Sequence, residues 1–389
     1  MGKRASHSHS RLWRGFVVAL VAALAAPLFK VDPLGADELL REAAHCPADI
    51  KQPYVFLYWF ATYLAFAPMS LAIDAVRGVL RAVEPDSLTA EFHAADAVRA
   101  SRIVRLALDA CDAALEDASS EALRPPAGTP PMGAVSLAGG GHKVTQYFGQ
   151  WYYLQRHQLL RNDTKLLGCS TGAPLAAMLA PSLDETDPEA QLRTLKAVAQ
   201  TVISLELQLW ANQRTLLKGR MHDWWPHMLE NFKPHLPSDR AATLKMRGRL
   251  YVALTRPFSP APSWLFTDFD EPSELLHALS LSGAIPFNII DRPFLSFRGH
   301  AVIDGGFANL KPQPSEESVG GRPVVVAYNN NAAAVWTENP LLAALYGAAR
   351  IGAPLALDHE FVADITNGYR DMHRILHERH ERMAARASS

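Results

Sequence analysis

The sequence contains little cysteine and almost no net charge. Its three cysteines, Cys46, Cys111 and Cys169, are too few and too scattered along 389 residues for a disulfide framework or a zinc site. They are therefore expected to be free thiols. The formal net charge of −1 gives no electrostatic reason to expect binding to nucleic acid. No tandem repeat is visible, so one large domain or two modest ones are expected.

Two apolar runs stand near the N-terminus. The first, at 15–29, follows several basic residues, which is typical of a signal peptide or signal anchor. It is short for the roughly 20 residues that a membrane span needs. The second, at 52–73, carries no charge and is long enough to span, although Pro68 would kink it. We expect attachment to an endomembrane or a lipid droplet; the alternative is two helices packed on the main domain.

A proline-rich segment, RPPAGTPP at 124–131, divides the chain. Before it, apolar residues recur at intervals of three and four over 94–118, which predicts an amphipathic helix. We expect a membrane-associated helical region with its linker over 1–130 and the main domain over 131–380.

Strand and helix patterns alternate after this linker. A short strand within 133–141 precedes a helix at 145–160, and a strand at 164–169 precedes a helix at 172–180. This order predicts an α/β fold with a parallel sheet and right-handed crossovers. Other segments complete the prediction: strands at 248–256, 300–304 and 323–328, mostly helix over 188–235, and a charged terminal helix at 360–385. The arginines and histidines of that helix are expected to form a solvated face rather than a binding patch.

The stretch KLLGCSTGAPLAAML contains a Gly-x-Ser-x-Gly pattern centred on Ser170. A nucleophilic serine needs a sharp turn between a strand and a helix, and Gly168 and Gly172 would relieve the crowding there. The following helix would point its positive N-terminus at the reacting centre. The alternative is an ordinary turn between strand and helix.

Three consecutive glycines, Gly139, Gly140 and Gly141, end the first predicted strand. Their backbone N–H groups could stabilise an oxyanion, since no side chain blocks the approach. A phosphate-binding loop is the alternative, but no Gly-Lys-Ser/Thr follows, and Val144 stands where a dinucleotide fingerprint needs glycine.

A serine nucleophile also needs a base. Asp304 ends the strand at 300–304 and is followed by two glycines, a turn that would expose its carboxylate at the sheet's edge. A plain Asp-Gly turn is the alternative. A Ser-Asp-His arrangement also stays open, since four histidines occur late in the chain: His359, His373, His377 and His380.

The glycine triplet, Gly-x-Ser-x-Gly and Asp-Gly-Gly, in this order, resemble the patatin-like phospholipases. That resemblance covers about 133–378 and implies a three-layer α/β/α fold with a mostly parallel central sheet. It also implies a Ser-Asp dyad without histidine. Further segments are similar to the branch that includes adipose triglyceride lipase and adiponutrin: 136–141, 248–256, 274–287, 296–312 and 367–376.

Carried over by position, Ser170 would be the nucleophile, Asp304 its base, and the glycines 139–141 the oxyanion donors. Two residues depart from the family's pattern, Val144 for a glycine and Thr171 for a small alanine, whereas Lys143 keeps a basic position. Neither departure removes a catalytic group, so an active enzyme is expected.

The resemblance therefore implies a serine acyl hydrolase, a triacylglycerol lipase or a phospholipase A, that acts on glycerolipids without a metal or cofactor. A transacylase using the same dyad and a non-catalytic scaffold on a lipid surface are the alternatives. The aromatic and methionine-rich segment 221–232 is expected to line an acyl pocket, to touch lipid, or to be a buried helix face.

Overall fold

The structure is a computed structural model, and it describes residues 96–116, 123–211, 221, 224–257, 259–285, 289–290, 294–315, 317–327, 355 and 357–387. All of them belong to one compact unit, Met69–Ser389. The apolar runs at 15–29 and 52–73 lie outside the described residues, so membrane attachment stays a prediction. Within the described ranges, no helix has the length and apolar character needed to cross a membrane.

A central sheet organises this unit, with the strand order β5-β6-β3-β2-β1-β7 and with β4 also paired to β3. Strands β7, β1, β2 and β3 run parallel, whereas β4 and β6 are antiparallel to β3, and β5 is antiparallel to β6. The bounds are β1 Ala134–Leu137, β2 Lys165–Cys169, β3 Leu250–Thr255, β4 Ser263–Phe266, β5 Leu295–Phe297, β6 His300–Asp304 and β7 Val324–Ala327. The inner strands β1 and β2 are almost entirely buried, as expected for a parallel sheet covered on both faces.

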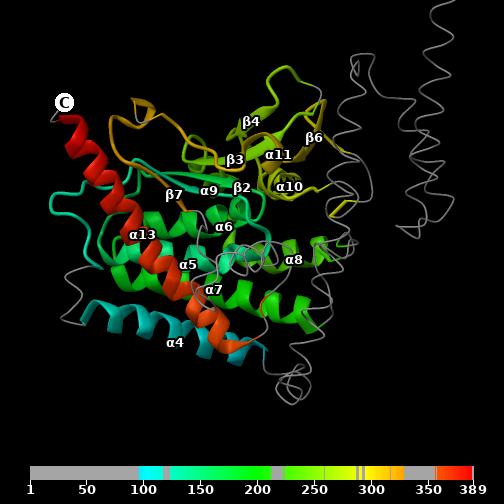
Figure 1. The fold of residues 1–389 in the computed structure, drawn as a ribbon. Helices are drawn as coiled ribbons and strands as arrows, with labels where there is room; N and C mark the ends of the chain where they lie inside the picture. The colour runs from blue at the N-terminus through cyan, green and yellow to red at the C-terminus, as the bar shows by residue number, and fades with distance from the viewer. Residues whose placement is uncertain are drawn as a thin grey trace, which may run out of the picture. The chain divides into compact units, whose positions relative to one another are not determined.

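Helices cover the sheet and give the α/β/α layering that the resemblance implies. Figure 1 shows α5, α7 and α13 together on one side of the strands, with α4 beyond them. The longer helices are α4 Asp96–Glu116, α5 Thr145–Arg156, α6 Gly172–Leu179, α7 Pro188–Ala211, α8 Trp225–Phe232, α9 Arg240–Lys245, α10 Pro272–Ser282 and α13 Asp358–Ala387. Short helical turns complete the set: η2 Gly141–Val144, η3 Ala180–Asp184, η5 Lys233–His235, α11 Gly306–Asn309 and η6 Glu317–Val319.

The terminal helix α13 is buried along one face rather than solvated all round. It packs closely against α5, where a Cβ added at Gly149 would lie 1.8 Å from the carbonyl oxygen of Ile365. A Cβ added at Gly368 would lie 2.0 Å from the carbonyl oxygen of Gln146. Glycine on both helices therefore allows their backbones to touch. This contact holds α5 in place, and α5 follows the glycine triplet 139–141 along the chain.

Helix α4 also joins this core, although the sequence places it before the proline-rich linker. Ile103, Ala107 and Cys111 are fully buried in the same cluster as the residues of α5 and α13. Arg99 adds an ion pair with Asp358 at the start of α13, with 2.6 Å between Nε and the carboxylate. The division at residue 130 stays a prediction about the whole chain.

Candidate active site

Ser170 lies at a strained turn between β2 and α6. Its φ of 50° is in the left-handed region that residues other than glycine seldom adopt. The turn is also tight, since a Cβ added at Gly168 would lie 2.3 Å from Ala173 Cα, and one added at Gly172 would lie 2.2 Å from the carbonyl oxygen of Leu137. The two glycines of the Gly-x-Ser-x-Gly pattern thus make room for the turn that holds Ser170 at the end of the strand.

Asp304 lies beside Ser170 because of how three strands align. The end of β2 pairs with β3 at Ala253, and the end of β6 pairs with β3 at Leu254, so the two ends lie at the same level on either side of β3. Ser170 Oγ donates a hydrogen bond to Asp304 Oδ2 over 2.7 Å, although 134 residues separate them. The topology therefore brings together the two residues that the sequence predicts as nucleophile and base.

Hydrogen bonds fix both members of this pair. The other carboxylate oxygen of Asp304, Oδ1, accepts a hydrogen bond from the backbone N–H of Gly306 over 2.6 Å. The backbone N–H of Ser170 donates to Ser282 Oγ over 3.0 Å, and that hydroxyl donates to the carbonyl oxygen of Ala253 over 2.7 Å. Ser282 on α10 thus ties the serine turn to the strand that separates it from Asp304. The sequence reasoning missed Ser282, since nothing local distinguishes it from the two other serines of α10.

The electrostatic setting suits Asp304 to proton transfer. Burial raises the pKa of its carboxyl group to about 6, while the hydrogen bonds from Ser170 and Gly306 lower it and so limit the rise. A carboxylate with a pKa near neutrality is a stronger base than an exposed one and is still ionised at pH 7. It can therefore take a proton from the serine hydroxyl that already points at it.

The three glycines of the triplet have different roles in hydrogen bonding. The N–H of Gly139 donates to the carbonyl oxygen of Leu310 over 3.0 Å, and this glycine packs against the serine turn: a Cβ there would lie 3.3 Å from Ser170 Cβ. The N–H groups of Gly140 and Gly141 donate to no residue that the structure describes. These two, rather than Gly139, are therefore available to an oxyanion next to Ser170.

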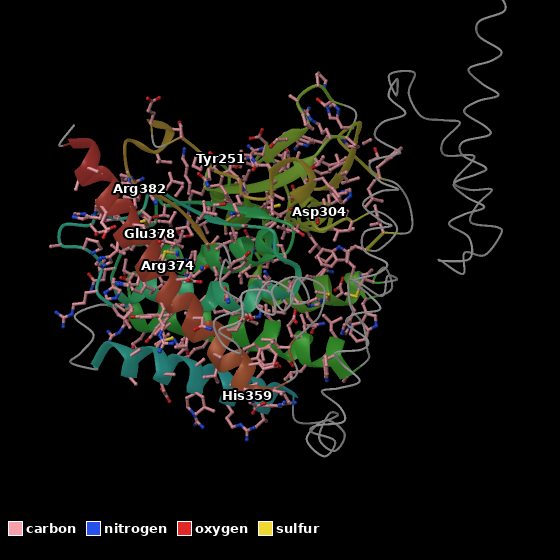
Figure 2. All side chains as sticks on the ribbon, in the orientation of Figure 1. Tyr251, Asp304, His359, Arg374, Glu378 and Arg382 are labelled. Carbon is pink, nitrogen blue, oxygen red and sulfur yellow. The ribbon has the colours of Figure 1, made fainter. Side chains whose placement is uncertain are left out.

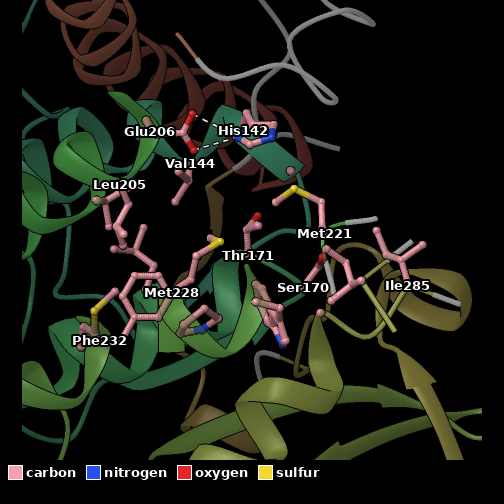
Figure 3. Close-up of a pocket in the computed structure, with 18 residues that line it drawn as sticks. His142, Val144, Ser170, Thr171, Leu205, Glu206, Met221, Met228, Phe232 and Ile285 are labelled. Carbon is pink, nitrogen blue, oxygen red and sulfur yellow. Dashed lines mark hydrogen bonds and ion pairs between the residues drawn. The ribbon is translucent and has the colours of Figure 1, made fainter. Parts of the chain in front are cut away.

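Ser170 opens onto a mostly apolar cavity between α6, α7 and α8. Figure 3 shows Ser170 and Ile285 toward one end of this cavity and Leu205 and Phe232 toward the other. Four residues of the aromatic and methionine-rich segment 221–232 line it, which is one of the places predicted for that segment: Met221, Trp225, Met228 and Phe232. This surface suits a long apolar group attached to whatever reacts at the serine.

One polar pair interrupts the apolar lining. His142 Nδ1 lies 2.9 Å and 3.0 Å from the two carboxylate oxygens of Glu206, and both side chains are buried. His142 comes directly after the glycine triplet, and Glu206 lies on α7 (Figure 3). Sequence reasoning missed the pair because nothing local marks a glutamate within an apolar helix as the partner of a distant histidine.

The four late histidines all lie on α13, apart from the Ser170–Asp304 pair. His373 contacts Tyr153, with 3.3 Å between Nδ1 and the tyrosine oxygen, and His377 Nε2 lies 2.9 Å from the carbonyl oxygen of Arg124. Figure 2 shows His359 at the start of α13, well separated from Asp304. A Ser-Asp-His arrangement with any of them is therefore wrong for this structure.

Two of the three thiols lie in the part of the chain that the structure describes. Cys111 and Cys169 are free, as the sequence predicts, and both are buried. Cys46 lies outside the described residues. In the part of the chain that the structure describes, no three histidine, cysteine or acidic side chains are grouped so that they could hold a metal ion.

Comparison with known proteins points to one family. Residues 135–313 match the family model described as patatin-like phospholipase. No curated protein matches the chain. Among solved structures, the crystal structure of VipD from Legionella pneumophila is similar over 51% of this chain and 49% of its own, with 14% sequence identity and a TM-score of 0.30. The chain thus spans about half the length of that protein. The segment 135–313, which holds Ser170, Asp304 and the glycine triplet, accordingly matches a patatin-like phospholipase domain.

Proposed function

We propose that this protein is a lipid acyl hydrolase that cleaves fatty acyl esters of glycerolipids through Ser170 and Asp304. The observation that supports this most directly is the 2.7 Å hydrogen bond from Ser170 Oγ to the buried carboxylate of Asp304, at the mouth of an apolar cavity. The match of this segment to the patatin-like phospholipases supports the same class of reaction.

The reaction proceeds in two halves. Asp304 accepts the hydroxyl proton while Ser170 Oγ bonds to the ester carbonyl carbon, and the carbonyl π-electron pair moves onto oxygen. The C–O bond to the alcohol then breaks, and the proton on Asp304 passes to the leaving alkoxide. Water next gives a proton to Asp304 and attacks the acyl-serine, and the proton returns to Ser170 as the fatty acid leaves. Each half passes through a tetrahedral oxyanion.

The backbone N–H groups of Gly140 and Gly141 stabilise this oxyanion. The N–H of Thr171, at the start of α6, joins them, since it also donates to no described residue and since the positive end of the helix favours negative charge there. Such donors are worth about 3 kcal/mol each in the transition state of acyl transfer. Gly139 instead packs against the serine turn and donates its N–H to the carbonyl oxygen of Leu310.

The substrate class follows from the cavity and from the sequence. An apolar cavity next to the nucleophile fits a fatty acyl chain, and similarity over 248–256, 274–287 and 296–312 points to the branch with adipose triglyceride lipase and adiponutrin. The apolar runs at 15–29 and 52–73 would hold the enzyme at a membrane or lipid-droplet surface, where such substrates gather.

The test is fatty acid release from triolein emulsions and from phosphatidylcholine vesicles by the full chain. Wild type should release fatty acid, and Ser170→Ala and Asp304→Asn should each lower kcat by several orders of magnitude. A fluorophosphonate should label wild type and leave Ser170→Ala unlabelled. Acyl transfer to a glyceride in place of release would indicate a transacylase, and an unlabelled, folded wild type would refute the proposal.

A further inference from the structure

A second hollow lies in line with the active-site cavity. The cavity follows one face of α6 through Thr171, Pro174, Leu175 and Met178, at the spacing of neighbouring helix turns. A groove of ≈ 540 Å³ continues beyond, along Met178 and Pro181 to Asp184. Met178 is the residue that lines both.

Helix α7 and the segment from α8 onward also run from the cavity into the groove. On α7, Val202 and Leu205 line the cavity, whereas Thr194 and Ala197, two turns earlier, line the groove. From α8 onward, Phe232 lines the cavity and 234–238 line the groove. The cavity and the groove are therefore lined by the same three parts of the chain: α6, α7, and α8 with the segment that follows it. Met178, on α6, lies where the cavity meets the groove.

The two hollows differ in chemistry. Apart from the serine turn and the His142–Glu206 pair, apolar side chains line the cavity. The groove instead has several charged side chains among its lining residues: Arg193, Lys245 and Asp184. Met178 is only 1% exposed, so its side chain is packed inside the protein where it lines both hollows.

We propose that Met178 sets the length of acyl chain over which the cavity adds binding, so that methylenes beyond this length meet its side chain and gain nothing. This inference rests on the proposed function. The eight residues of α6 span about 12 Å at 1.5 Å per residue. An extended acyl chain advances about 1.25 Å per carbon, because each C–C bond of about 1.5 Å is inclined to the chain axis, so about ten carbons reach from Ser170 to Met178.

The chain-length profile follows from this geometry. Up to about ten carbons, each added methylene enters the apolar cavity and raises kcat/KM, by about fourfold for an ester taken from water and by less for an ester taken from a micelle. Beyond that length the added methylenes are stopped by Met178 and bring no gain. Removing the side chain beyond the β-carbon opens the cavity into the groove and lets the rise continue.

The experiment compares p-nitrophenyl octanoate, decanoate and palmitate in mixed micelles of one composition. In wild type, kcat/KM should rise from octanoate to decanoate and not increase for palmitate. Met178→Ala should raise the ratio of palmitate to octanoate at least tenfold, and Met178→Phe should lower the ratio of decanoate to octanoate. Because each readout is a ratio within one preparation, partial loss of folded protein cancels.

Met246→Ala is the matched control. Met246 lines the groove and not the cavity, so its removal enlarges the groove without joining the two hollows, and the ratio of palmitate to octanoate should stay near that of wild type. An unchanged ratio in Met178→Ala, or equal changes in the two alanine variants, would overturn the role of Met178 while Ser170-dependent hydrolysis of octanoate keeps the proposed function. Absence of Ser170-dependent hydrolysis of every ester would instead refute the proposed function, and the inference with it.

Discussion

Replacing Asp304 with asparagine should abolish turnover and make the protein more stable. Asparagine matches aspartate in shape and can keep both hydrogen bonds. Its Oδ1 can accept from the N–H of Gly306, and its NH₂ group can donate to Ser170 Oγ, which then becomes the acceptor. The substitution thus removes one buried charge and leaves the packing intact, so a change in stability reports that charge.

The size of the effect follows from the pKa of Asp304. Burial raises that pKa from 3.8 to about 6, a shift of about 2 units, and each unit corresponds to about 1.4 kcal/mol. Because the folded-state pKa is the higher one, unfolding releases a proton between the two values, and stability falls as pH rises through this window. Below about pH 4 the carboxyl group of Asp304 is protonated in both the folded and the unfolded state, so its burial lowers the free energy of unfolding by nothing. Above about pH 6 the full loss, about 3 kcal/mol, is present.

Asp304→Asn does not titrate, so it should escape this loss. Its free energy of unfolding should exceed that of wild type by about 3 kcal/mol at pH 8 and by roughly half as much at pH 5. Urea denaturation followed by circular dichroism at pH 5, 6.5 and 8 measures both differences. Asp109→Asn, at an exposed aspartate on α4, is the control for the chemical change from aspartate to asparagine. A variant no more stable than wild type at pH 8, or a gain that does not shrink toward pH 5, would refute the reasoning.

Three other changes have definite expected outcomes. The kcat/KM of wild type should rise with pH around a midpoint near 6, since Asp304 must be ionised to accept the proton; a pH profile on a neutral ester measures this. Ser282→Ala should leave the N–H of Ser170 without its acceptor. Urea denaturation should then show a loss of stability of about 1–3 kcal/mol, and kcat should fall about tenfold or more. Ser282→Thr keeps a hydroxyl group and should retain more of the stability and more of kcat. Gly149→Ala should force α5 away from Ile365 on α13 and cost more than about 3 kcal/mol in thermal unfolding. Alanine at Gly128, where a Cβ meets nothing within 4 Å but φ is 76°, should cost only the backbone strain of about 1–2 kcal/mol.

Local patterns were enough to predict most of the parallel sheet and the turn at Ser170. The strands β1, β2, β3, β6 and β7 lie within the predicted segments, because apolar runs bounded by glycine or proline are visible along the sequence. The helix predicted over 145–160 exists but ends at Arg156. The short strands β4 and β5 were not predicted, since three or four residues such as those at 295–297 give too little pattern.

The arrangement of the site depends on contacts between distant segments, and these could not be read from local pattern. No spacing indicates that β3 would lie between the ends of β2 and β6 and so set the separation of Ser170 and Asp304. The same holds for His142 and Glu206, which are 64 residues apart. The glycine triplet looks uniform in sequence. In the structure, the carbonyl oxygen of Leu310 accepts a hydrogen bond from the N–H of Gly139, whereas the N–H groups of Gly140 and Gly141 donate to no described residue.

The site combines three features that each lower stability. Ser170 has a positive φ, which costs about 1–3 kcal/mol for a residue other than glycine. The buried charge of Asp304 costs about 3 kcal/mol more at neutral pH. The N–H groups of Gly140 and Gly141 are left without acceptors among the described residues, and Gly141 lines the apolar cavity. A protein that needed this fold only as a scaffold on a lipid surface would be more stable with an unstrained turn and a neutral side chain at position 304. All three costs fall on the groups that acyl transfer requires: the nucleophile, its base and the oxyanion donors. Their coincidence is what catalysis demands, and it favours an enzyme over a scaffold.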